Sequence, residues 1–299
     1  MAHAHAHVDP AADRGRLRVA LVLVLGLMVG EVVAGVLAGS LALLSDAGHM
    51  LTDAAALGLA LLAAGLAERP ARGRFTFGMR RAEILSAQFN GVTLVVLAAL
   101  IVFEGVRRLV SPPEVDGATV LVVALVGVVV NVAAARVLAG SGRRSLNVEG
   151  AFQHILTDLF AFIGTAIAGA VVLATGFDRA DGIAALVVAA LMLRSGYGLL
   201  RDSGRVLLEA APRELDPQEI GRALASEPHV VEVHDLHVWE VTSGFPALSA
   251  HVIVGPDCDA QKHRRDLARL LHERFGIDHS TLQIEHAGGP LEIEPLRRD

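Results

Sequence analysis

The sequence has almost no cysteine and no strong excess of either charge. Its one cysteine, Cys258, excludes an intramolecular disulfide and any metal site built from several cysteines. The net charge is -6 and the acidic residues gather after residue 208, so no nucleic-acid-binding surface is expected. Met1 is not followed by a short apolar stretch with a small-residue cleavage signal. We therefore expect the first apolar segment to remain as a membrane helix.

Apolar residues, by contrast, are abundant and come in long uninterrupted runs. They make up 53% of the chain, whose mean hydropathy is +0.51. About 20 consecutive apolar residues are enough for a helix to cross a membrane. The sequence therefore predicts an α-helical membrane protein with six transmembrane helices, at about Leu17 to Ala38, Leu41 to Ala67, Ala82 to Val106, Ala118 to Leu138, Glu149 to Ala174 and Gly182 to Leu200.

Arginines cluster at three boundaries of these runs. One cluster precedes the first span, one lies in the link from Glu68 to Arg81, and one follows the fourth span. Because basic residues favour the cytoplasmic side, we expect both termini in the cytoplasm of a multi-pass inner-membrane protein. Arg107 and Arg108 fall on the predicted outer side, where their long side chains can reach the lipid headgroups.

After residue 211 the composition changes to that of a soluble domain. Asp216 before Pro217 is typical of a helix start, and strands, a second helix and a last strand are predicted at Val230 to Val241, Pro246 to Val254, Asp259 to Phe275 and Ser280 to Glu285. We expect an α+β cytoplasmic domain at 212–287, with helices on one face of the sheet, after a transmembrane domain at 17–211. Residues 1–16, which contain histidines, and residues 288–299 are expected to be tails, the first disordered.

Histidine is scarce in the apolar region, and each histidine there has an aspartate four residues later. Between His49 and His229 the only histidine is His154, and the two pairs are His49 with Asp53 and His154 with Asp158. Residues i and i+4 share one face of a helix, so each pair can reach a common point. An isolated charge inside a membrane costs at least a few kcal/mol, so such residues normally face a bundle interior, a partner or an ion path.

Two interpretations fit these pairs. Each pair is either a hydrogen bond that joins helices or one half of a metal site, and two His with two Asp match the tetrahedral ligand set of zinc. The repetition favours the metal. Asp46, one turn before His49, either orients its ring or caps the helix. Asn90 and Asn131 are candidates for ordinary hydrogen bonds between helices.

Four phrases of the sequence are specific when taken together: Ser45-Asp46-Ala47-Gly48-His49-Met50-Leu51-Thr52-Asp53, Phe77-Gly78 with Arg81-Ala82-Glu83, the pair His154 and Asp158, and His234-Asp235-Leu236-His237-Val238-Trp239. In these phrases the sequence resembles the cation diffusion facilitator family of divalent-metal transporters, and in particular its zinc-transporting branch. The resemblance covers about Arg16 to His286 and implies a homodimer with six spans and a ferredoxin-like cytoplasmic domain.

By position, the resemblance implies a transport site made of His49, Asp53, His154 and Asp158. A second, cytoplasmic metal site is implied at His234, His251, His279 and His286, as an alternative to ordinary solvated histidines. His237 ranks behind His234 as a ligand. The link from Glu68 to Arg81 contains neither histidine nor aspartate, so no metal site is expected there.

With the resemblance, the sequence predicts export of zinc from the cytoplasm in exchange for protons, with zinc also as a regulatory ligand, no organic cofactor and no enzyme activity. Two imidazoles disfavour manganese and magnesium but do not separate zinc from cadmium, cobalt or nickel. One rival is a membrane-anchored metal sensor that uses only the cytoplasmic domain, although six spans exceed what an anchor needs. Another is an intramembrane metalloenzyme, disfavoured because four protein ligands leave no open position for water.

Overall fold

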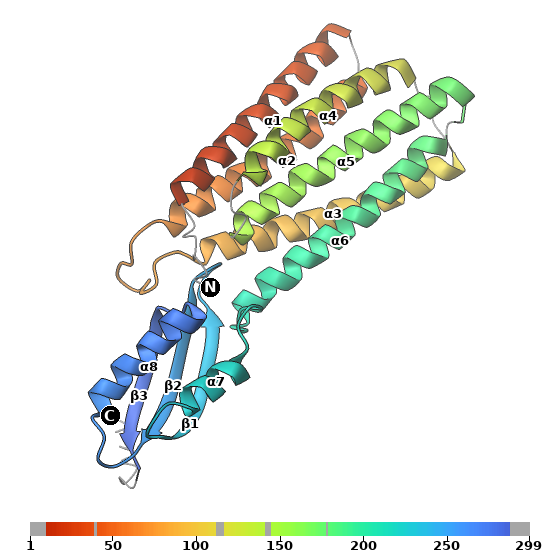
Figure 1. Ribbon diagram of the computed structural model, residues 1–299. Helices are drawn as coiled ribbons and strands as arrows, with labels where there is room; N and C mark the ends of the chain where they lie inside the picture. The colour runs from red at the N-terminus through yellow and green to blue at the C-terminus, as the bar shows by residue number, and fades with distance from the viewer. Residues whose placement is uncertain (1–9, 39–40, 112–116, 141–144, 178, 288–299) are drawn as a thin grey trace, which may run out of the picture. The chain divides into compact units, whose positions relative to one another are not determined.

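The computed structural model describes residues 10–38, 41–111, 117–140, 145–177 and 179–287. Within these ranges, the side chains of residues 10–13, 31, 34–38, 41–49, 52, 117, 119, 120 and 181 lie outside the description. The chain forms two compact units, which meet in the sequence between Gly204 and Arg205. The first is helical, and the second contains a sheet (Figure 1).

Long helices make up the first unit, and their bounds are α1 Pro10–Ala38, α2 Leu41–Ala67, α3 Ala82–Val110, α4 Gly117–Ala139, α5 Leu146–Thr175 and α6 Arg179–Leu207. Among the described residues, the stretches long and apolar enough to cross a membrane are Ala82–Val110, Leu121–Ala139, Leu146–Thr175 and Gly182–Leu207. Helix α2 adds a shorter apolar stretch, Asp53–Ala67. The protein is therefore a membrane protein with at least four strongly apolar helices.

Helix α1 begins earlier than the first predicted span. Residues 10–16, which the sequence places in a disordered tail, belong to this helix. Proline is common at the first position of a helix, and Arg14 in the second turn forms an ion pair with Glu68, just after α2. Residues 1–9 and 288–299, which hold the rest of the predicted tails, lie outside the described residues.

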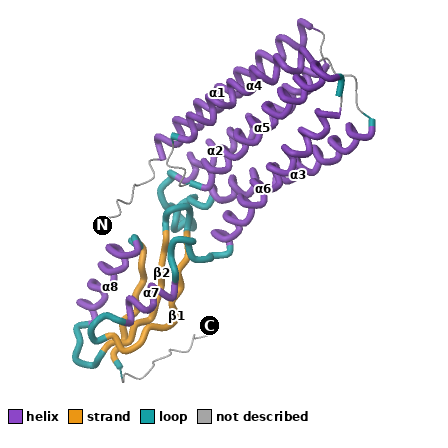
Figure 2. The backbone as a smooth tube through the Cα atoms, turned by 45° about the vertical axis from the view of Figure 1, so that its right-hand side comes forward, coloured by secondary structure: helices purple, strands orange, loops and turns teal. Residues whose placement is uncertain are grey.

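Glycines bring α3 and α6 into close contact at two levels. A Cβ added at Gly196 would lie 3.1 Å from the carbonyl oxygen of Gly91, and a Cβ added at Gly182 would lie 3.1 Å from that of Gly105. The glycines of each helix are 14 residues apart, so the two helices stay close over four turns. Small residues allow such an approach and increase van der Waals packing in a membrane. Figures 1 and 2 both show the two helices side by side.

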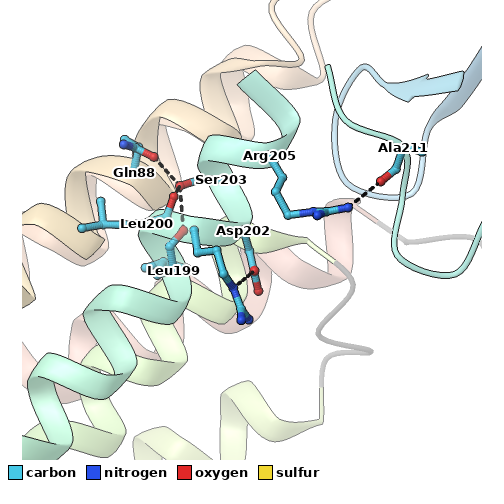
Figure 3. A network of polar contacts seen from close by, with 8 residues as sticks. Gln88, Leu199, Leu200, Asp202, Ser203, Arg205 and Ala211 are labelled. Atoms are coloured by element: carbon cyan, nitrogen blue, oxygen red, sulfur yellow. Dashed lines mark hydrogen bonds and ion pairs between the residues drawn. The ribbon is translucent and has the colours of Figure 1, made fainter. Parts of the chain in front are cut away.

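A polar contact joins the same two helices near the end of α6 (Figure 3). The Ser203 hydroxyl donates to the carbonyl oxygen of Leu199 at 2.6 Å and is also hydrogen-bonded to the side-chain amide oxygen of Gln88 on α3. In the last turn of α6, Arg205 donates to the carbonyl oxygen of Ala211 at 3.0 Å. The second contact holds the chain close to α6 as it leaves the helix.

The two arginines that oppose the charge bias have a partner on their own helix. Glu104 of α3 lies 3.2 Å from Arg108 and 3.6 Å from Arg107. These spacings of three and four residues place opposite charges on one helix face. The carboxylate offsets the positive charge locally, which makes the two arginines compatible with the predicted outer side.

In the second unit, helices α7 and α8 pack on one face of a sheet. The elements are α7 Pro217–Ala225, β1 Val230–Glu240, β2 Pro246–Val254, α8 Ala260–Phe275 and β3 His279–His286. Strand β2 is central, antiparallel to β1 and parallel to β3. Leu224 of α7 and Leu271 of α8 share one core with alternate residues of β2, such as Leu248 and Val252. The order and bounds of these elements follow the sequence prediction closely.

Side-chain caps fix where the two helices of this unit begin. Asp216 accepts a hydrogen bond of 2.9 Å from the backbone N–H of Gln218, as the sequence predicts. Asp259 accepts one of 3.0 Å from the N–H of Lys262, and this bond lowers the pKa of the Asp259 carboxyl. Helix α8 ends at Gly276, whose φ of 67° is in the left-handed region.

Replacing Gly196 with valine is expected to destabilise the helical unit. Its Cβ would lie 2.9 Å from Cγ2 of Val95 and 3.1 Å from the backbone of Gly91, so the helices would have to separate. Overpacking of this kind costs about 1–3 kcal/mol. The midpoint of thermal unfolding in detergent should fall. The matched control is Gly198→Val on the same helix, where an added Cβ meets nothing within 4 Å. An equal loss in both variants would contradict the close contact.

Candidate metal centre

Two polar contacts align helices α2 and α5, which run antiparallel. Asp53 of α2 accepts a hydrogen bond of 2.9 Å from Nε2 of His154 on α5. Seven residues later on α2, the carbonyl oxygen of Ala60 accepts one of 2.7 Å from Asn147, seven residues before His154. Seven residues span about two turns, or about 10 Å. The two contacts therefore fix one register between the helices.

Asp158 joins Asp53 and His154 in a group that can hold a metal ion. One ligand atom from each residue lies within 4.8 Å of the other two. The side chain of His154 is 2% exposed, and that of Asp53 is 17% exposed. Zinc binds imidazole nitrogen and carboxylate oxygen at about 2.0–2.2 Å, so small side-chain rotations would bring the three ligands to one ion. Two carboxylates can offset the charge of a dication inside the apolar bundle.

The predicted site has a fourth member, His49. Its backbone is helical and lies one turn before Asp53 on α2, but its side chain is outside the described part of the structure. The same holds for Asp46, predicted to support His49 or to cap the helix. Of the four predicted ligands, the structure thus brings three together, and these three come from both predicted pairs.

Among the described residues, neither buried asparagine makes a hydrogen bond to another helix. Asn131 of α4 donates to the carbonyl oxygen of Gly127 in its own helix, at 3.0 Å. Asn90 of α3 is fully buried, and neither atom of its amide has a partner among the described residues. The Nδ1 atom of His154 is also buried without a partner in this part of the chain. Asn131 thus bonds within its own helix, and for Asn90 no partner lies among the described residues.

The histidines of the second unit separate into distinct places. His234 and His251 are paired across β1 and β2, with ring centroids 5.3 Å apart. On β3, His279 pairs with Ala247 and His286 with Val254, at opposite ends of the strand. Seven residues of a strand span about 23 Å. Within one chain, one ion can therefore contact His279 or His286 but not both.

Asp235 is a polar neighbour of this histidine pair that the sequence reasoning missed. Its carboxylate lies 2.9 Å from Nε2 of His237 and 3.9 Å from Nε2 of His251. The φ of Asp235 is 51°, in the left-handed region, where the register of β1 shifts between His234 and His237. The phrase His234-Asp235-Leu236-His237 shows in the sequence that Asp235 lies near these histidines. The shift in strand register at Asp235 is visible only in the structure.

Comparisons with known proteins agree with this architecture. The cation efflux transmembrane domain matches residues 17–208, and the cytoplasmic domain of cation efflux proteins matches residues 212–287. The chain belongs to the cation efflux family. Two family models thus cover both structural units, one after the other along the chain.

Relatives of this cation efflux protein that match almost its whole length are found in bacteria. It is 36% identical over 289 residues to the cadmium, cobalt and zinc/H(+)-K(+) antiporter of Bacillus subtilis, covering 95% of this chain and 92% of that one. It is 41% identical over 292 residues to the zinc transporter ZitB of Escherichia coli, covering 96% and 93%. A solved metal-bound C-terminal domain of the CzcD transporter from Cupriavidus metallidurans is 32% identical, covers 24% of this chain and 99% of that domain, and gives a TM-score of 0.23.

Removing either carboxylate of the group is expected to abolish tight metal binding. Asp53→Asn and Asp158→Asn keep the side-chain size but lose the charge, and zinc affinity should fall by more than the roughly 10–100-fold that loss of a supporting residue costs. Isothermal titration calorimetry in detergent would measure the loss of one binding event. Glu104→Gln is the control, since this carboxylate pairs with arginines on its own helix. Native affinity in Asp158→Asn would contradict the site.

Proposed function

We propose that this protein exports zinc from the cytoplasm in exchange for protons. The observation that carries the proposal is the group of Asp53, His154 and Asp158, held between two helices of an apolar bundle. The names of the two relatives, a cadmium, cobalt and zinc antiporter and a zinc transporter, support the substrate class and the coupling to protons. The outward direction follows the efflux family to which the chain belongs.

We infer that all six helices of the first unit cross the inner membrane, with both termini in the cytoplasm. Helices α1 and α2 have 29 and 27 residues, and at 1.5 Å per residue each exceeds the hydrocarbon thickness of about 30 Å. The transmembrane domain would extend over residues 17–211. Residues 212–287 would form a ferredoxin-like cytoplasmic domain, supported by the strand order and the helix packing of the second unit.

The site can couple metal to protons because its ligands bind either one. A metal requires neutral imidazole and ionised carboxylate, so protonation of His154 or of the aspartates competes with the ion directly. Nε2 of His154 and the Asp53 carboxylate lie 2.9 Å apart, close enough for a proton to be held between them. Exposure of the site to an acidic outer side therefore favours release of the metal. The protonated site then becomes accessible again from the cytoplasm, where it releases its protons.

His49 is proposed as the fourth ligand, one turn before Asp53, with Asp46 as a supporting residue. A set of two imidazoles and two carboxylates favours zinc over manganese and magnesium. Cadmium, cobalt and nickel have similar ligand preferences, so they are proposed as secondary substrates. No organic cofactor is needed, because the chemistry consists of ligand exchange and proton transfer at one site.

The cytoplasmic domain is proposed to pair with its copy in a homodimer and to bind regulatory zinc. His234 and His251 offer two ligands side by side, with Asp235 close by. His279 and His286 lie at opposite ends of β3, so their participation would require ligands from both copies of the domain. Zinc shared between the copies would tighten the dimer when its cytoplasmic concentration rises.

Zinc flux should depend on a proton gradient and on the metal group. Reconstituted vesicles with an acidic interior should take up external zinc faster than vesicles at equal pH, because internal protons compete with zinc for the site. A proton ionophore should remove the difference, and Asp53→Asn should reduce uptake to the level of empty vesicles. A zinc-sensitive dye inside the vesicles gives the rate. Native flux in Asp53→Asn would remove this site from the proposal.

The same vesicles separate the rival functions. A membrane-anchored sensor would bind zinc without moving it across the membrane under any gradient. An intramembrane metalloenzyme needs an open metal position and a general base, and its zinc would stay bound during turnover. Parallel assays with cadmium, cobalt, nickel and manganese define the substrate range, with manganese expected to be transported least.

The zinc-linked dimer has its own test. Zinc should lower the dissociation constant of the detergent-solubilised dimer, measured by sedimentation, and His251→Ala should remove the effect. His263→Ala is the control, because this histidine lies on α8 and contacts the backbone at Asp259 and Pro228. A dissociation constant unchanged by zinc would count against regulation through this domain.

A further inference from the structure

Asn90 is buried without any hydrogen-bond partner in the described part of the chain. Asn90 is 0% exposed, and both the nitrogen and the oxygen of its side-chain amide lack a hydrogen-bond partner among the described residues. An amide in this situation loses its hydrogen bonds to water and gains none from the protein, which destabilises the fold. Native proteins contain few such groups, and a bound water or ion commonly accounts for them.

Asn90 lies about one helical turn from the metal group. A Cβ added at Gly150 of α5 would be 3.5 Å from the amide nitrogen of Asn90. Gly150 precedes His154 by four residues, or about 6 Å along the helix. It also lies between His154 and Asn147, the two α5 residues that contact α2. Asn90 therefore lies beside the interval of α5 that these two contacts define.

Other unpartnered polar atoms continue from Asn90 toward the N-terminal ends of α3 and α5. Ser86 lies one turn earlier on α3, and Ser145 and Asn147 lie at the start of α5. All three residues are at most 4% exposed, and the hydroxyls and the Asn147 amide oxygen have no partner among the described residues. Together with Asn90 they form what we call the polar seam.

The position of the polar seam is not random. In the described part of the protein, every buried side-chain polar atom without a partner belongs to the seam or is Nδ1 of His154. From Ser145 to His154 these groups extend over about 13 Å of α5, and they end at the metal group. In the proposed orientation, the other end of the seam is the cytoplasmic side of the bundle.

We propose that the polar seam is the route by which a partly hydrated divalent cation reaches the metal group, and that the Asn90 amide oxygen binds this cation on the way. The inference rests on the proposed function, which requires access from the cytoplasm. A neutral amide oxygen is a weak ligand for a dication, so it can replace a water without trapping the ion. Water bonded to the seam satisfies the same atoms when no ion is passing.

Removal of the Asn90 amide should slow transport without removing the metal group. Asn90→Leu is expected to lower zinc flux in vesicles at least tenfold and to change the zinc affinity of the detergent-solubilised protein by less than threefold. The midpoint of thermal unfolding should stay the same or rise, because an unpartnered polar group is replaced by an apolar one. Asn90→Ser, which keeps a neutral oxygen ligand, should retain flux within threefold.

The matched control is Asn131→Leu, the same substitution at another buried asparagine whose amide bonds within its own helix. It should keep flux within twofold. Native flux in Asn90→Leu would overturn the inference while leaving the proposed function intact. A fall in flux accompanied by a lower unfolding midpoint would also overturn it, since it would assign Asn90 a structural role.

A second measurement tests the water in the seam and does not depend on transport. In a Cys258→Ser background, which removes the only native cysteine, Asn90→Cys should react with a small cationic thiol reagent added in water. Ala98→Cys is the control, because Ala98 is on the same helix, is 0% exposed and lies in an apolar cluster. Its rate should be at least tenfold lower, and equal rates would overturn the inference. If the native protein moves no zinc, the proposed function fails, and this experiment still tests the seam.

Discussion

The contact between Asp53 and His154 is the constraint on which the helical unit depends. A carboxylate and an imidazole are costly to bury among apolar helices unless each has a partner, and here each is the other's partner. The bond from Asn147 to the carbonyl oxygen of Ala60 repeats the same alignment two turns away. A shift of α2 along α5 by one residue would break both contacts, so the helix register and the metal group are one structural feature.

The two ways in which helices pair in this unit suit different tasks. Helices α3 and α6 approach closely through glycines, as at Gly91 and Gly196, which leaves no room between them for water or an ion. Helices α2 and α5 meet through polar groups, and Asp53 and His154 among them belong to the group that can hold a metal ion. Helix α3 contacts a member of each pair, because Asn90 lies beside Gly150 of α5 while the adjacent Gly91 contacts α6. A close apolar contact thus supports one side of the polar route.

Much of the fold could be predicted because local patterns determine it. Strand alternation and the Asp216 cap predicted the elements of the second unit, and long apolar runs predicted the helices of the first. The start of α1 at Pro10 was missed, because a short polar segment is typical of a disordered tail. The ion pair of Arg14 with Glu68, which holds this segment in the helix, is a contact between residues distant in the sequence. His279 and His286 were expected to reach one metal site, but they lie at opposite ends of β3. The sequence did not show this because it does not give the direction in which β3 pairs with β2.

The sequence by itself determined that aspartate and histidine share helix faces inside an apolar region, because the spacing i to i+4 is a property of any helix. It also determined the chemistry those residues allow. Only the tertiary structure decided that Asp53 reaches His154 across two helices, since no local pattern encodes the register between helices distant in sequence. The tertiary structure likewise decided that Asn131 bonds its own helix and Asn90 has no protein partner in the described residues, although the sequence presents both as the same residue in similar apolar runs.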